Sequence, residues 1–320
     1  MYQPARASQS EFVPVRTLQY HVRRWNGEAS PASASPSSPS SPSRPPLVLM
    51  HGWMDVGASY QFVVDALSQA FFAGRTVIAP DWRGFGLSRL PAPCDHYVFA
   101  DYLADLDHLL DHYAPGQPVD LVGHSMGGNV CMAYAGVRPA RIRRLVNLEG
   151  FGLPATTPDQ APRRYAQWMD EIRALERGEK SLKAYDSADG VAQRLIKTNP
   201  RLSADKAAWL ARQWAAPDAQ GRWRILGDAA HKITSSQIYR VEEALALYDG
   251  ITAPTLAVEA SDDSMGLWWK DRYDLPEYHA RLRHVRDCRT AVVQDAGHML
   301  HHDQPGAVAA LIESFLSTPE

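Results

Sequence analysis

A serine flanked by two glycines follows the apolar run VDLV, which begins at Val119. Gly123, Ser125 and Gly127 form the pattern G-x-S-x-G, and the helical pattern GGNVCMAYAGV follows. Between a strand and a helix, this pattern places the serine on a strained turn with its hydroxyl above the end of a sheet. The helix start adds a field that favours developing negative charge. The sequence therefore predicts that Ser125 is a nucleophile, in preference to an incidental serine in a glycine-rich turn.

A serine hydroxyl is a weak nucleophile near neutral pH, so a base must accept its proton. His298 is the predicted base, because it follows a strand-like run and a glycine in VVQDAGHMLHHDQP, just before the final helix. His301 and His302 compete for this role, but they lie one helical turn further on and are expected to pack or to face solvent. No H-E-x-x-H motif or thiolate accompanies the three histidines, so no metal site is predicted.

The third group must be an acid that orients the imidazole, and three carboxylates compete for this role. Asp262 and Asp263 follow the run TLAVEA, the usual place for the acid in the chain order Ser, acid, His. Glu149 ends the preceding strand-like run, in LVNLEGFGLP, and could also reach the imidazole. Each could instead cap a loop or face solvent. Chain order makes Asp263 the first choice, with Glu149 and Asp262 as alternatives.

Backbone amides must stabilise the negative charge that develops on the attacked oxygen. The predicted donors are the amide of Met126, directly after the serine, and the amide of Trp53, in HGWMD after the run LVLM. His124 and Trp268 are candidate substrate-binding residues beside this machinery. Tryptophans in and near the segment 153–250 hint at an apolar pocket, although packing explains them equally well. This chemistry needs no cofactor, and none is predicted.

Strand-like and helical patterns alternate over most of the chain, and these elements have to position the candidate residues. Strand-like runs occur at 16–26, 47–53, 76–82, 119–125, 144–150, 255–260 and 290–298. Helical patterns occur at 57–70, 97–113, from the serine to about 137, and at 305–316. Continuous apolar runs indicate strands buried on both faces, which form mostly parallel sheets with helices on each side. The predicted fold class is α/β.

The alternation stops at 153–250, where the pattern is helical and rich in Trp, Arg and Ala. An all-helical insertion there would lie over the carboxyl ends of the strands, where such sheets bind ligands. We therefore predict a helical lid at 153–250, inserted into a core formed by 1–152 and 251–320. The Ser- and Pro-rich segment 27–46 joins two strand-like runs and is expected to be disordered or extended.

Composition excludes several classes of partner. The net charge is −3 and the 33 basic residues are scattered, so neither nucleic acid nor a membrane is expected. The three cysteines (Cys94, Cys131 and Cys288) form no C-x-x-C pair, which suits a reducing compartment. The first residues, MYQPARASQSEFVPV, lack the apolar core of a signal peptide, so a cytoplasmic location is expected. The expected partner is a small-molecule substrate, for a monomer or homodimer.

Four motifs carry a family resemblance: HGWMDVGASY, APDWRGFGLS, VGHSMGGNV and AGHMLHHDQP. In this order they resemble the α/β-hydrolase superfamily over about 47–152 and 251–317. Within this superfamily, the chain is most similar to the serine hydrolase-like proteins and to the branch of haloalkane dehalogenases and epoxide hydrolases. The segment RLIKTNPRLS in the predicted lid also resembles the serine hydrolase-like proteins. The resemblance implies the α/β-hydrolase fold, with DWRGFGLS (81–88) as a loop that shapes the pocket.

The sequence departs from that branch at the nucleophile. Its dehalogenases and epoxide hydrolases use aspartate, whereas this chain has Ser125, so their reactions are disfavoured. The segment LEGFGLP resembles the place where several dehalogenases carry their acid, which keeps Glu149 close to Asp263 as a candidate. The prediction is a carboxylesterase-like serine hydrolase that cleaves an ester, thioester or related acyl bond of a small apolar substrate. A C–C hydrolase of diketone-like ring-fission products, an acyltransferase and a non-catalytic binding protein are the alternatives.

Overall fold

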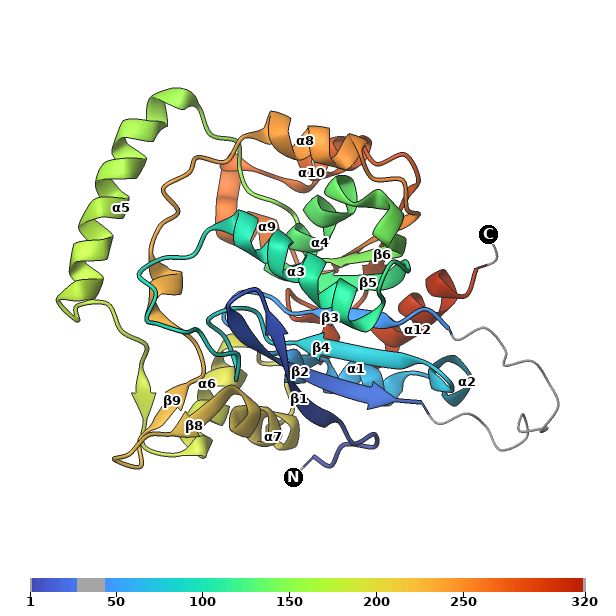
Figure 1. Ribbon diagram of the computed structural model, residues 1–320, viewed down its shortest axis with the longest axis horizontal. Coiled ribbons are helices and arrows are strands. Elements are labelled where there is room, and N and C mark those ends of the chain that lie inside the picture. The colour runs from blue at the N-terminus through green and yellow to red at the C-terminus, as the bar shows by residue number, and fades with distance from the viewer. Residues whose placement is uncertain (1, 28–43, 319–320) are drawn as a thin grey trace.

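An eight-stranded sheet crosses the molecule in the computed structural model, which describes residues 2–27 and 44–318 (Figure 1). The strand order is β1-β2-β4-β3-β5-β6-β10-β11, and all strands from β4 to β11 in this order pair in parallel. The strands are β1 (Gln9–Val15), β2 (Leu18–Asn26), β3 (Leu47–Met50), β4 (Thr76–Pro80), β5 (Val119–His124), β6 (Ile142–Leu148), β10 (Thr255–Ala260) and β11 (Cys288–Val293). This sheet confirms the predicted α/β class. Most of the Ser- and Pro-rich segment 27–46 lies outside the described residues.

Helices cover both faces of the sheet and bury a hydrophobic core on each. On one face lie α3 (Phe99–Tyr113), α4 (Met126–Val137), α8 (Val241–Asp249) and α10 (Leu275–Leu282). On the other lie α1 (Gln61–Ala66), α2 (Gln69–Phe72), α11 (Leu300–Asp303) and α12 (Pro305–Leu316). Every residue of β3, β5 and β10 is buried. The continuous apolar runs in the sequence therefore correspond to strands covered on both faces.

The lid contains helices and a small sheet. Its helices are α5 (Ala161–Glu176), α6 (Ala188–Thr198) and α7 (Ala204–Trp214), and its antiparallel sheet is formed by β7 (Ala184–Tyr185), β9 (Trp223–Ile225) and β8 (Ala215–Pro217). The expectation of an all-helical insertion is therefore wrong. Strands of two or three residues are too short to show the alternation by which strands are recognised.

The last helix of the predicted lid packs with the core. A Cβ atom on Gly136 of α4 would lie 2.0 Å from the carbonyl oxygen of Leu247 in α8, so the two helices touch backbone to backbone. In contrast, no residue of α5 is buried, and this helix projects from the body at the left of Figure 1. The predicted lid, which ends at residue 250, therefore includes α8, a helix that packs on the core, and only about 153–240 lies outside the core helices.

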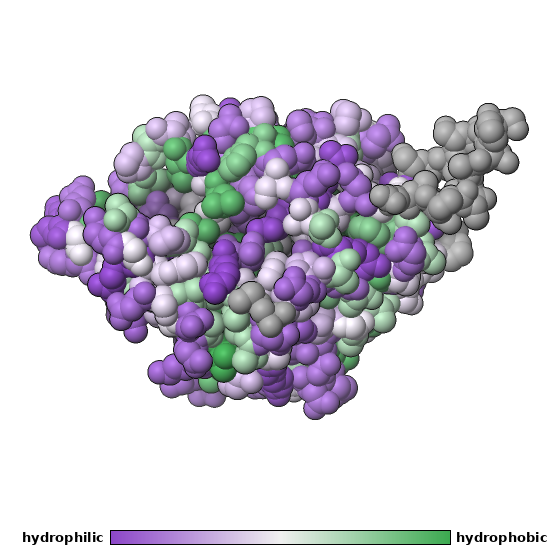
Figure 2. All heavy atoms as spheres, turned by 90° about the horizontal axis from the view of Figure 1, so that it is seen from below, coloured by the Kyte–Doolittle hydropathy of each residue, from purple (hydrophilic) through white to green (hydrophobic). Residues whose placement is uncertain are grey.

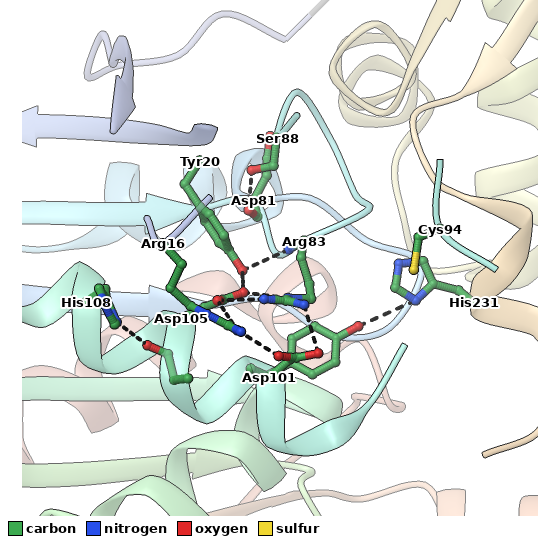
Figure 3. A network of polar contacts seen from close by, with 12 residues as sticks. Arg16, Tyr20, Asp81, Arg83, Ser88, Cys94, Asp101, Asp105, His108 and His231 are labelled. Carbon is green, nitrogen blue, oxygen red and sulfur yellow. Dashed lines mark hydrogen bonds and ion pairs between the residues drawn. The ribbon is translucent and has the colours of Figure 1, made fainter. Parts of the chain in front are cut away.

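A buried polar network fixes the loop 81–88 against β2 and α3 (Figure 3). Arg83 donates two hydrogen bonds to Asp105, at 2.5 Å from Nε and 2.7 Å from Nη2. The hydroxyl of Tyr20 donates to the same carboxylate at 2.5 Å and accepts a bond from the Arg83 amide at 3.0 Å. Because Asp105 is fully buried, loss of Arg83 would leave its charge with only the more distant Arg16, whose Nη1 atom lies 3.2 Å from Oδ1, as a cationic partner.

The remaining elements are short, and the surface is mixed. They are α9 (Ser264–Trp269) and the 3-10 helices η2 (Gly57–Tyr60), η3 (Pro139–Arg141), η4 (Pro158–Gln160), η5 (Ala229–Lys232) and η6 (Lys270–Arg272). Hydrophilic residues cover most of the face in Figure 2, with apolar patches between them. Within 2–27 and 44–318, no helix has the length and apolar character needed to cross a bilayer.

Candidate active site

Ser125 lies on a tight turn between β5 and α4. Its backbone has φ 52° and ψ −118°, in a region that costs a residue other than glycine about 1–3 kcal/mol. The flanking glycines are required by close backbone contacts. A Cβ atom on Gly123 would lie 2.4 Å from the carbonyl oxygen of Gly127, and one on Gly127 would lie 2.4 Å from that of Met50. The turn thus presents the hydroxyl of Ser125 at the carboxyl edge of the sheet.

His298, in the loop after β11, lies against this hydroxyl. Its Nε2 atom is 2.9 Å from Ser125 Oγ, and its Nδ1 atom is 3.2 Å from Glu149 Oε2. When Glu149 is ionised it only accepts hydrogen bonds, so the proton of the neutral ring then belongs on Nδ1, which leaves Nε2 free to accept the serine proton. Burial lowers the pKa of His298 to about 3, so the ring is neutral near pH 7. The arrangement can deprotonate the serine.

Glu149 directly follows β6 and is held from the neighbouring strand. Its Oε1 atom accepts a hydrogen bond of 2.7 Å from the amide of Ala260, the last residue of β10. The side chain is 1% exposed. Burial raises the pKa of Glu149 to about 7, although the Ala260 amide and the Ser264 hydroxyl act to lower it. A carboxylate in such a site is stabilised most when the imidazole beside it takes up a proton.

The two aspartates after β10 have other partners, which corrects the choice made from chain order. Asp263 is the N-cap of α9, and its Oδ1 atom accepts a 2.8 Å hydrogen bond from the amide of Gly266. Asp262 pairs with Arg201, at 2.7 and 3.1 Å, and is about half exposed. An aspartate that begins a helix satisfies an otherwise free amide, which explains its presence without a role at His298.

Two backbone segments meet at Ser125 as oxyanion stabilisation would require. A Cβ atom on Gly52 would lie 3.1 Å from the Cβ of Ser125, so the backbone leading to Trp53 passes against the serine. Met126 is the first residue of α4, where amides have no acceptor within the helix. These are the segments that carry the two predicted amide donors.

Trp268 and His124 both contact His298, but from different sides. The ring of Trp268 in α9 meets that of His298 edge to face, with centroids 4.1 Å apart, and is 42% exposed. Trp268 can therefore contact a bound substrate. His124 is buried, and its Nε2 atom lies 2.7 Å from the carbonyl oxygen of His298. Its predicted role in substrate binding is not supported, because the side chain points into the core and supports the loop of His298.

The lid is attached to the loop 81–88 close to the serine. The ring of His231 stacks between Phe85 and Tyr97, with both centroids 3.7 Å away. The indole nitrogen of Trp53 donates to the carbonyl oxygen of His231 at 3.3 Å. The segment predicted as a lid therefore contacts the core at the loop 81–88 and at Trp53.

Sequence reasoning missed a buried group behind His298. Asp55, His124 and His301 each place one possible ligand atom within 4.8 Å of the others. His301 was expected to pack or to face solvent, and it is fully buried. The sequence offered one signal for this group: Asp55 ends the motif HGWMD after β3, and β3 pairs with β5, the strand that carries His124.

Comparisons with known proteins show which proteins this chain is similar to. The family model of the alpha/beta hydrolase fold matches residues 45–305. A serine hydrolase-like protein of Danio rerio is 26% identical over 280 residues, which cover 85% of this chain and 81% of that protein. A 2-hydroxy-6-oxo-2,4-heptadienoate hydrolase of Pseudomonas putida is 38% identical over 111 residues, which cover 34% of this chain and 38% of that protein.

Solved structures extend the likeness over the whole fold. The thioesterase domain from the curacin biosynthetic pathway is 23% identical and has a TM-score of 0.77, covering 96% of this chain and 99% of that one. The residues matched by the family model include β3, the turn of Ser125, Glu149 and His298. Because this model matches more than half of the chain, the chain belongs to the α/β-hydrolase family.

Proposed function

We propose that this α/β hydrolase is a serine hydrolase that cleaves an ester, thioester or related acyl bond through an acyl-enzyme. The observation that carries the proposal is the continuous row of contacts from Ser125 Oγ to His298 and from His298 to Glu149. Glu149 takes the place of Asp263 as the acid. The names of the relatives, a serine hydrolase-like protein and a thioesterase domain, support the same class of reaction.

The proposed reaction begins when Ser125 Oγ attacks the carbonyl carbon and transfers its proton to His298 Nε2. The amides of Met126 and Trp53 stabilise the resulting oxyanion, each by about 3 kcal/mol. Glu149 stabilises the imidazolium through Nδ1–H. His298 then gives the proton to the leaving alcohol or thiol.

Deacylation repeats these steps with water. A water molecule transfers a proton to His298 Nε2 and attacks the acyl carbon, and the tetrahedral intermediate collapses as that proton returns to Ser125 Oγ. The carboxylic acid leaves, and the serine is regenerated. An acyltransferase would differ only in using an alcohol in place of this water.

The exposed aromatic residues around the site favour an apolar acyl group. Trp268 contacts His298 directly, Trp53 lies at the oxyanion segment, and Leu267 is 77% exposed beside Trp268. Burial of such side chains by a ligand is favourable at about 25 cal/mol per Å² of apolar surface. A small apolar substrate therefore fits the surroundings of Ser125.

A second candidate function is hydrolytic C–C cleavage of a diketone-like ring-fission product. It is favoured by the local likeness to 2-hydroxy-6-oxo-2,4-heptadienoate hydrolase. The same three side chains could serve both reactions. The difference lies in the bond that is broken, so substrates decide between them.

Two measurements test the proposal. A fluorophosphonate probe should label the wild-type protein and fail to label Ser125→Ala, whereas equal labelling of both would refute the role of Ser125. A panel of p-nitrophenyl esters and acyl thioesters of graded chain length should then be hydrolysed by the wild type only. Faster turnover of a vinylogous diketone than of any ester would establish the second candidate. No labelling and no turnover would identify a binding protein.

A further inference from the structure

Four polar side chains form a buried cluster behind His298, which we call the Asp55–histidine cluster. Its members are Asp55 in the loop after β3, His124 at the end of β5, and His301 and His302 in α11; they are 5%, 1%, 0% and 4% exposed. The imidazole centroids of His124 and His301 are 4.3 Å apart, as are those of His301 and His302. None of these residues takes part in the proposed reaction.

The cluster leaves several of its polar atoms without a hydrogen bond. Asp55 Oδ2, His124 Nδ1 and both ring nitrogens of His301 have no hydrogen-bond partner among the described residues. Each unpaired buried group costs about 1–3 kcal/mol, and more when it is charged. Such groups are rare in proteins unless an ion or a water molecule binds them. Their convergence in one place therefore points to a bound species.

The atoms that converge are suitable metal ligands. Asp55, His124 and His301 each offer one ligand atom, all within 4.8 Å of one another, and His301 Nε2 lies 3.8 Å from Asp55 Oδ2. Zn²⁺ binds imidazole nitrogen and carboxylate oxygen at about 2.0–2.2 Å, so ligand atoms around it lie about 3.4 Å apart. Binding would thus contract the cluster by small movements of its side chains.

The surrounding hydrogen bonds already orient two of these ligands. His124 Nε2 must donate to the carbonyl oxygen of His298, 2.7 Å away, and this fixes the lone pair of the neutral ring on Nδ1. Asp55 Oδ1 accepts a hydrogen bond from the hydroxyl of Ser59, which leaves Oδ2 free. Metal-binding histidines and carboxylates are commonly held in this way.

We propose that Asp55, His124 and His301 bind a divalent transition-metal ion of the Zn²⁺ type. The mixture of two imidazoles and one carboxylate suits Zn²⁺, Co²⁺ and Ni²⁺ better than Mg²⁺ or Ca²⁺. All three ligands are buried, so the ion has a regulatory or structural role and does not contact substrate.

The site is coupled to His298 through a single side chain. A metal ion on His124 Nδ1 pulls the ring away from its present position, while Nε2 holds the backbone of His298. Displacement of His298 lengthens its contact with Ser125, so the ion inhibits turnover. This consequence, unlike the binding itself, rests on the proposed function.

Metal binding is tested on the full-length protein after treatment with a chelator. Co²⁺ should bind with a stoichiometry of one per chain and give visible absorption bands of a four- or five-coordinate ion, and Zn²⁺ should displace it in calorimetry. Asp55→Asn and His301→Gln should each weaken binding at least tenfold. Circular dichroism and thermal unfolding identify which variants are folded, and either folded variant suffices for the comparison.

Control variants separate this site from adventitious binding. His96→Gln removes a partly exposed histidine that contacts Asp95 at 2.6 Å, and Ser125→Ala removes the hydroxyl next to His298. Both should bind Co²⁺ like the wild type. The proposal would be overturned if the wild type showed no stoichiometric binding, or if the folded Asp55→Asn and His301→Gln variants bound Co²⁺ as tightly as the wild type. The cluster would then be assigned to bound water.

Activity measurements test the coupling separately. Zn²⁺ should inhibit ester hydrolysis by the wild type and lose at least tenfold in potency against His301→Gln. If the ion binds and ester hydrolysis is unaffected, the coupling is refuted while the site stands. If the ion binds and no ester is hydrolysed at all, the proposed function fails and the site again stands.

Discussion

Glu149 Oε2 lies 3.2 Å from His298 Nδ1, although the two residues are 149 positions apart in the chain. The contact follows from the register of the sheet. His124 of β5 pairs with Leu148 of β6, so Ser125 and Glu149 both come directly after paired residues at the same edge. The acid and the nucleophile thus follow adjacent strands, and His298, in the loop after β11, contacts both of them.

The choice of acid can be tested with three matched variants. Glu149→Gln should lower kcat for a p-nitrophenyl ester by about 10³–10⁴, because a neutral amide favours the wrong imidazole tautomer. Asp263→Asn should stay within a few-fold of the wild type, since asparagine also caps helices. Asp262→Asn breaks only an exposed ion pair and should be equally mild. If Glu149→Gln kept full activity and Asp263→Asn lost it, Asp263 would be the acid that orients His298.

The same glutamate should destabilise the protein at alkaline pH. Its pKa is raised from 4.5 to about 7 in the folded state, so the folded state holds more protons between these values, and stability falls as pH rises through this window. Glu149→Gln should therefore raise the free energy of unfolding near pH 8 by about 3 kcal/mol, and by much less near pH 5. Urea unfolding at both pH values measures this difference. An equal effect at the two values would contradict it.

Buried histidines should make the protein sensitive to acid. Burial lowers the pKa of six histidines below the usual 6.5: His51, His124, His231, His298, His301 and His302. The unfolded chain therefore takes up more protons below pH 6.5, and stability falls as pH falls, by up to about 1.4 kcal/mol per pH unit for each histidine. Glu149 has the opposite sign and offsets part of this loss.

Urea midpoints near pH 8 and near pH 5 measure the acid sensitivity. The midpoint should drop strongly at the lower pH. His302→Phe, which removes one of these histidines beside the ring of Phe62, should make the drop smaller. A midpoint that does not change between the two pH values would show that the buried imidazoles become protonated without unfolding.

The strained turn predicts that glycine at position 125 makes the protein more stable than alanine does. Ser125 has φ 52°, which glycine adopts at little cost, whereas alanine remains strained. Both variants lose the hydroxyl and should be inactive. Ser125→Gly should be more stable than Ser125→Ala by about 1 kcal/mol, after the entropy that glycine adds to the unfolded chain. Equal melting temperatures would show that the turn relaxes in the variants.

The sequence predicted the elements whose signal is local. Continuous apolar runs marked the buried strands, and the glycines around Ser125 marked a turn whose backbone contacts exclude side chains. The base followed because His298 has a glycine before it and a helix after it. These features depend on neighbouring residues alone, and so they can be recognised without knowing the packing.

The remaining features depend on contacts between distant segments. Asp263 and Glu149 both follow strands, and only the register of β6 and β10 decides which carboxylate reaches His298. His301 lies on a helix of four residues, too short for a pattern to show that its side chain is buried. The lid strands have the same difficulty, because pairing in the small sheet creates them.

The path between β6 and β10 affects how the protein can be altered. These strands pair with each other, and α8 packs on α4, so β6, α8 and β10 would form an ordinary parallel crossover without residues 153–240. The entropy cost of a connection grows only with the logarithm of its length. Ser125, Glu149 and His298 all lie outside this excursion. Replacing the segment between positions 152 and 241 with a different one should therefore leave the three proposed reacting groups in place.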